Sequence, residues 1–186
     1  MTMIIKGAIT KLMKGYPVDA QRYDVKGAIL DGTKQLSNGQ LVKYTNTTGY
    51  YQAVDTDQTI SAADDIAGFK LAVNVQLLKV WPGNGQEVKT DVHEAFDLCV
   101  RGLIAVPVSF SYTNDNEGET TNRDAAFAKL QPNKKVYATT AGVITTDNTA
   151  IDIDARFLGI IENVVEEVGD STTTVTCLAA INYRNA

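Results

Sequence analysis

The stretch Val106-Pro-Val-Ser-Phe-Ser-Tyr112 decides the fold class, because its apolar and polar residues alternate without a break. Its four large apolar side chains share one parity, and a period of two is typical of a β-strand with one buried face. Pro107 has no N–H to donate to a neighbouring strand. We therefore expect this strand to lie at a sheet edge or beside a bulge.

Outward from this strand, the chain consists of short apolar runs separated by turn residues. Asp31-Gly32 and Asn38-Gly39 are turn dipeptides, since Asp, Asn and Gly tolerate a positive φ. Residues 113–124 contain no apolar side chain, so they predict an exposed polar loop. The pattern predicts an all-β fold: a single β-barrel-like or β-sandwich domain of short antiparallel strands, over residues 23–186.

Residues 1–22 are expected to form an N-terminal arm. The spacing of their apolar side chains suits an amphipathic helix, but Gly7 and Gly15 interrupt it, and an extended arm lying on a neighbour fits equally well. Pro17 ends any helix there. The side chains at this spacing are Ile4, Ile5, Ala8, Ile9, Leu12, Met13 and Tyr16.

The overall charge argues against nucleic acid as a partner. The chain has 186 residues with 17 basic and 22 acidic side chains, a formal charge of −5, and no basic run. No apolar run approaches the roughly 20 residues that a membrane-spanning helix needs. The start lacks the pattern of a signal peptide. We expect no membrane partner, and a protein that stays in the cell that makes it or in a particle assembled there.

The sequence offers few groups for catalysis or metal binding. His93 is the single histidine, and its neighbours suggest a strand surface; no nucleophile motif accompanies it. Cys99 and Cys177 stand in apolar runs and are expected to be free, buried thiols. Two cysteines and one histidine far apart do not form a zinc site. We therefore expect no enzyme activity, no catalytic residue, no cofactor and no metal.

Carboxylates are the remaining polar candidates. The loop 113–124 loosely resembles a calcium-binding loop, but Thr113 stands where the first carboxylate is expected. The pairs Asp55/Asp57 and Asp152/Asp154 could serve a glycosidase, although a spacing of two on a strand more often puts both groups side by side on a wet face.

Aromatic and arm residues are the candidates for an interface. Tyrosines and tryptophan could anchor a protein partner or a sugar, or could fill the core. The predicted interface residues are Ile4, Ile5, Ile9, Leu12, Met13, Tyr16, Tyr50, Tyr51 and Trp81.

Several stretches, in this order and spacing, resemble the head decoration (capsid cement) proteins of tailed bacteriophages. The similarity spans most of residues 25–183 and is strongest in the carboxy-terminal part, whereas the loop 113–124 departs from the family pattern. The similar stretches are Gly27-Ala-Ile-Leu-Asp-Gly32, Leu36-Ser-Asn-Gly-Gln-Leu-Val-Lys43, Glu94-Ala-Phe-Asp-Leu98, Val106-Pro-Val108, the run from Leu130 to Thr146, Phe157-Leu-Gly-Ile-Ile161 and Thr173-Thr-Val-Thr176.

The resemblance implies a structural protein of the virion. Such a protein binds the outside of the assembled shell of major capsid protein, stabilises that lattice, and is often a homotrimer. It would be assembled in the host cytoplasm and located on the capsid exterior. Two other functions remain open: another virion component, such as a head-fibre base or tail protein, and a carbohydrate-binding β module.

Overall fold

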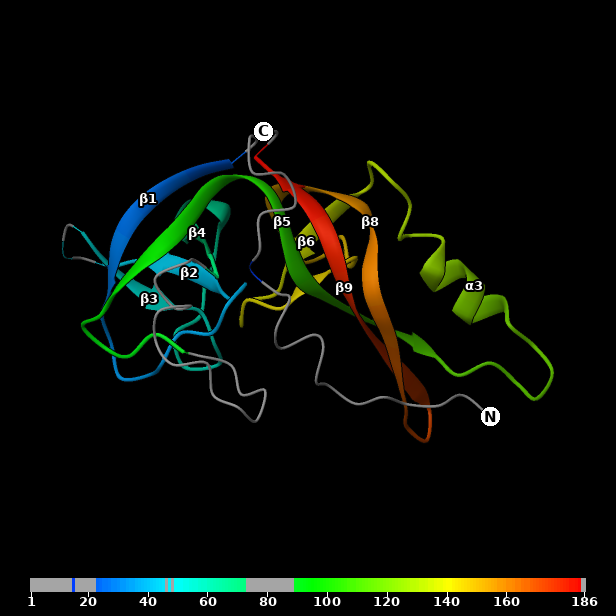
Figure 1. Ribbon diagram of the computed structural model, residues 1–186. Helices are drawn as coiled ribbons and strands as arrows, with labels where there is room; N and C mark the ends of the chain where they lie inside the picture. Colours follow the sequence, from blue (N-terminus) through cyan, green and yellow to red (C-terminus); the bar gives the residue numbers. More distant parts are fainter. Residues whose placement is uncertain (1–14, 16–22, 46, 48, 73–88, 185–186) are drawn as a thin grey trace, which may run out of the picture.

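The computed structural model describes residues 15, 23–45, 47, 49–72 and 89–184 (Figure 1). Strands account for 53% of the structure, and the strands of the described residues belong to one nine-stranded mixed sheet. The prediction of an all-β fold is confirmed.

The first part of the sheet closes into a ring. Strand β1 pairs with β3, β3 with β2, β2 with β4 and β4 with β5, and β5 pairs back with β1. The bounds are β1 Tyr23–Leu30, β2 Leu41–Tyr44, β3 Tyr50–Ala53, β4 Ile66–Lys70 and β5 Ala95–Thr113. The short 3-10 helix η1, Ala63–Asp65, precedes β4.

The second part closes into another ring that shares β5. Here β5 pairs with β7, β7 with β6, β6 with β8 and β8 with β9, and β9 returns to β5. The bounds are β6 Lys135–Ala138, β7 Ile144–Thr145, β8 Ile151–Val168 and β9 Thr172–Tyr183. The molecule is therefore a double ring of strands rather than one simple barrel.

Strand β5 changes partners at Gly102. That glycine lies opposite Tyr23 of β1 and also opposite Tyr183 of β9, so the first ring ends where the second begins. Its φ of 147° is a backbone conformation that side chains rarely allow. At Arg101-Gly102, one continuous strand thus changes its partners.

The cores follow the predicted alternation. Val106, Val108 and Phe110 are all buried, as the period of two requires. The first ring encloses a cluster that includes Leu30 and Phe96, while a larger cluster fills the second ring and its junction with β4. One sheet with two closed rings can bury both clusters without a covering layer of helices.

Three strands are longer than expected, and two pairings are parallel. β5 has 19 residues, β8 has 18 and β9 has 12, and together they extend beyond the rings as a ribbon (Figure 1). The pairs β1–β3 and β5–β7 are parallel. Turn residues in a sequence do not show that a strand can continue past them while it exchanges one neighbouring strand for another.

The exposed stretch 113–124 is not wholly a loop. Helix α3, Thr121–Phe127, begins inside it. The carboxylate of Asp115 accepts hydrogen bonds from the backbone N–H groups of Asn122 (2.7 Å) and Arg123 (3.0 Å) at the start of this helix. Such capping satisfies N–H groups that the first turn leaves free, and explains why a polar stretch becomes helical.

Most of the predicted arm, residues 1–14 and 16–22, lies outside the described residues. Whether it is helical or extended stays a prediction.

Candidate interaction surface

The outer part of β8 presents the largest group of exposed apolar side chains. Among the described residues, nine large apolar side chains are exposed, and five of them lie on this one strand. They are Leu158, Ile160, Ile161, Val164 and Val168, which we call the β8 patch.

The β8 patch lies where the strand has a neighbour on one side only. Pairing with β6 ends at Arg156, and the last backbone bonds on that side join Phe157 to Asn133 (2.7 Å) and Lys134 (2.8 Å). From Leu158 onward, the described strands supply only β9 as a partner. Within the described part of the chain, the patch therefore sits at a sheet edge, and unpaired main-chain groups at such an edge can bind another chain.

The edge is irregular. The pairing with β9 shifts between Phe157 and Gly159, between Ile160 and Glu162, and between Glu162 and Val165. Bulges of this kind twist an edge and oppose simple continuation of the sheet by another strand. The geometry favours a partner that packs against the apolar side chains over one that adds a long regular strand.

Helix α3 fixes one face of the ribbon that carries the patch. Phe127 packs edge-to-face on Phe110 at 5.5 Å between ring centroids, and both contact the cluster around Val175. Arg123 forms an ion pair with Glu166 of β8 at 3.1 Å. These contacts hold the ribbon in shape, so the patch is displayed by a supported element rather than by a loop.

The predicted interface residues have different outcomes. Tyr51 is only 2% exposed and packs against Phe96 at 6.4 Å, so it is a core residue and its assignment to an interface is wrong. Burial alternates along β3, and Tyr51 is one of the buried residues in this alternation, which explains the error. Tyr50 is half-buried on the opposite parity. The remaining predicted residues lie outside the described part of the chain: Ile4, Ile5, Ile9, Leu12, Met13, Tyr16 and Trp81.

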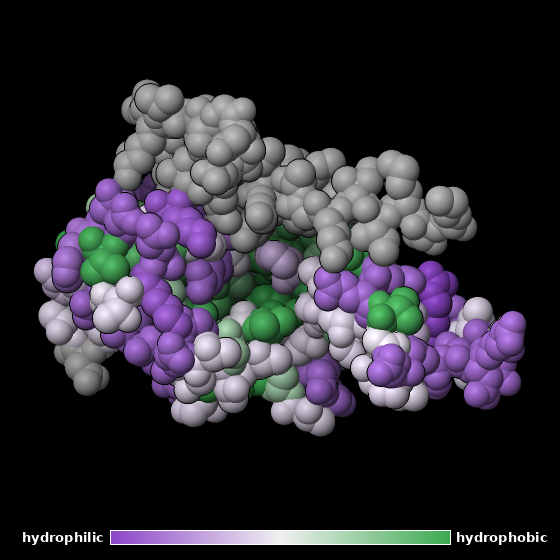
Figure 2. Space-filling view, turned by 90° about the horizontal axis from the view of Figure 1, so that it is seen from below, coloured by the Kyte–Doolittle hydropathy of each residue, from purple (hydrophilic) through white to green (hydrophobic). Residues whose placement is uncertain are grey.

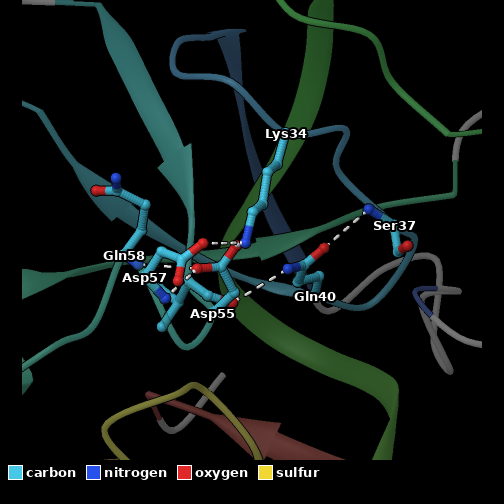
Figure 3. Close-up of polar contacts among 7 residues, drawn as sticks. Lys34, Ser37, Gln40, Asp55, Asp57 and Gln58 are labelled. Atoms are coloured by element: carbon cyan, nitrogen blue, oxygen red, sulfur yellow. Dashed lines mark hydrogen bonds and ion pairs between the residues drawn. The ribbon is translucent and has the colours of Figure 1, made fainter.

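The carboxylate pair Asp55/Asp57 is occupied by a lysine (Figure 3). Lys34 forms ion pairs with both carboxylates, at 3.2 Å for Asp55. Burial acts to raise the pKa of Asp55, but N–H groups of Gln58 and Asp57 and the Lys34 ammonium outweigh it, so the pKa lies below its ordinary value. A carboxylate held in its charged form does not suit the role of a general acid.

The second carboxylate pair, Asp152/Asp154, also includes a carboxylate that binds a lysine. Asp152 binds Lys135, and this bond holds the pKa of Asp152 below its ordinary value. Asp152 also accepts the N–H of Asp154 at 3.1 Å, which makes the pair part of a turn-like backbone feature with Asp154 at a φ of 52°. Both pairs thus act as local structural contacts.

The histidine and the two cysteines lie in different surroundings. His93 lies in a turn before β5 with a φ of 67°, so its expected place on a strand surface is wrong. Cys99 and Cys177 are buried free thiols, as expected, and burial raises the pKa of each to about 11. A protonated thiol is a poor nucleophile.

The described ranges contain neither a metal-binding cluster nor a membrane-spanning helix. No group of three His, Cys, Asp or Glu residues there could hold a metal ion. No helix in that part of the chain is long and apolar enough to span a membrane.

On the face seen in Figure 2, apolar surface gathers in a hollow between two hydrophilic ends.

No protein-family model matches the chain, and no curated protein matches its sequence.

Proposed function

We propose that the protein is a non-enzymatic structural component of a bacteriophage virion that binds the outside of the capsid and stabilises the lattice of major capsid protein. Support comes from the sequence resemblance to capsid decoration proteins and from the surface that the fold presents. As a homo-oligomer, trimeric in the form we favour, it would hold the shell through several small contacts at once.

The β8 patch is the observation on which this proposal depends. Large exposed apolar side chains that gather on one element mark sites of protein association, and five of the nine in the described residues lie on β8. The patch lies on a long ribbon that projects from the double ring (Figure 1), so a broad partner can reach it. A lattice of identical subunits is a partner of this kind.

A sugar-binding function has less support. Sugar binding would use a surface of exposed tyrosines, but Tyr51 is buried in the core. Tyr44 is half exposed, but its ring packs on Tyr51 at 5.6 Å between ring centroids.

The test is binding to assembled shells that lack this protein, measured by co-sedimentation. The variant Val164→Glu places a charge in the β8 patch, and Val143→Glu is the matched control, since Val143 is 47% exposed and Val164 43% exposed. Covering the exposed part of the Val164 side chain contributes roughly 1 kcal/mol, and burying an unpaired carboxylate there costs at least about 1 kcal/mol more, so we expect at least about a tenfold loss of affinity from Val164→Glu. The control should bind like the original chain.

Two results would count against the proposal. If Val164→Glu binds shells as tightly as Val143→Glu, the β8 patch is not the docking surface. If the unaltered chain does not sediment with shells at all, the proposed function is wrong.

A further inference from the structure

Gly15, the one described residue before Tyr23, is bound into the body of the protein. Its N–H donates to the carbonyl of Ala105 in β5 at 2.7 Å, and its own carbonyl accepts from the N–H of Ala72, just after β4, at 2.9 Å. It is also buried. One residue near the start of the chain therefore bridges the shared strand and the first ring.

Gly15 fills a gap along β5. On the side away from β9, β5 pairs with β1 as far as Gly102 and with β7 at Val108, and no described strand pairs with it between these residues. Pro107 lies in this interval and cannot donate a hydrogen bond. The carbonyl of Ala105 is the main-chain group that meets Gly15 there.

The position accepts no side chain. Gly15 has a φ of 80°, and a Cβ atom built on it would lie 2.5 Å from the nitrogen of Gly39 and 2.8 Å from the carbonyl oxygen of Lys70. Both obstacles are backbone atoms, which cannot rotate away as a side chain can.

The backbone around Gly15 is held in place by several hydrogen bonds. The N–H of Gly39 donates to the carbonyl of Lys70 at 2.8 Å, and the N–H of Lys70 donates to the carbonyl of Gln40 at 2.9 Å. The buried ammonium of Lys70 also donates to the side-chain oxygen of Asn38 at 2.6 Å. Backbone segments held by these hydrogen bonds have little freedom to move apart and admit a larger residue than glycine.

We propose that this seat, formed by Gly39, Lys70, Ala72 and Ala105, is a docking site for a short main-chain segment with glycine at its centre, and that it accepts the N-terminal segment of a second copy of this chain as well as its own. Recognition rests on two main-chain hydrogen bonds and on the absence of a Cβ atom. Neither depends on which copy supplies the segment, and exchange of identical elements is a low-cost route to association.

This inference is independent of capsid binding. It makes the N-terminal segment a separable ligand of the double ring, held through main-chain hydrogen bonds. Failure of shell binding would leave it unaffected.

The experiment uses the full chain with a protease site introduced between residues 17 and 22, cut after folding. A labelled peptide of residues 5–22 is then added in excess, and its retention on the body is followed by gel filtration. We expect the labelled peptide to replace the cut segment. The peptide with Gly15→Val should be retained at least about tenfold less, as expected from losing both bonds at roughly 1 kcal/mol each.

The matched control is the same peptide with Gly7→Val, which adds the same side chain at another glycine and should bind like the original. Equal retention of the Gly15→Val peptide would overturn the proposal, as would failure of the unaltered peptide to enter. Loss of the β spectrum on cutting would also overturn it, because the segment would then be an inseparable part of the fold.

Discussion

Gly68 in β4 offers the sharpest test of the double-ring packing. A Cβ atom at this position would lie 2.1 Å from the carbonyl oxygen of Cys99 and 3.2 Å from the Leu98 side chain. Ordinary contact begins near 3.4 Å, so Gly68→Ala must push β4 and β5 apart by more than an ångström. That displacement acts on the pairing of Phe69 with Cys99.

The cost can be worked from the groups affected. Two ladder hydrogen bonds weaken, at about 1 kcal/mol each. The packing of Phe69, whose ring meets Tyr183 at 5.1 Å, also loosens, at a further cost of about 1 kcal/mol. We expect Gly68→Ala to lower the free energy of unfolding by about 3 kcal/mol, which corresponds to a fall in Tm of about 6–12 °C.

The assay is denaturant and thermal unfolding followed by circular dichroism. Gly159→Ala in β8 is the matched control, because nothing lies within 4 Å of a Cβ atom at that position. It should change stability by less than about 0.5 kcal/mol. If Gly68→Ala unfolds at the same denaturant concentration as Gly159→Ala, β4 and β5 do not meet as described.

Three further predictions concern buried groups. Tyr183→Phe should raise the free energy of unfolding by about 1 kcal/mol in the same assay, since the Tyr183 hydroxyl is buried with no hydrogen-bond partner among the described residues; a loss of stability would contradict this. Burial raises the pKa of Cys177 from near 9.0 to about 11, so the unfolded chain releases this proton at a lower pH than the folded chain does. The free energy of unfolding should therefore fall between pH 9 and pH 11, and it should fall less steeply in Cys177→Ala. Equal slopes in the two proteins would refute the assignment. A chain that starts at Pro17 lacks the two bonds of Gly15, so it should melt below a chain that starts at Lys14, and identical melting would show that these bonds add no stability.

The local features were predictable because they depend on near neighbours in sequence. The turn at Asn38-Gly39 forms, with Gly39 at a φ of 69°, and the alternation from Val106 to Phe110 gives a strand with one buried face. The start of η1 is also a local feature: the carboxylate of Asp65 accepts hydrogen bonds from both the N–H and the hydroxyl of Ser61.

The features that depend on distant contacts were not predictable. Nothing in the sequence around Gly102 says that β5 serves two rings, because its partners, β1 and β9, lie at opposite ends of the chain. The β8 patch does have a signal in the sequence. Phe157, Leu158, Ile160 and Ile161 occupy both parities, which indicates a strand with apolar groups on both faces and hence a second contact besides the core.

The proposed function is tested most directly by electron microscopy of phage particles assembled with and without this protein. We expect density on the outer surface of the capsid in particles that contain it, with the ribbon of β5, β8 and β9 against the shell, and no such density in particles that lack it. Density at the tail, inside the shell, or nowhere on the particle would contradict the account.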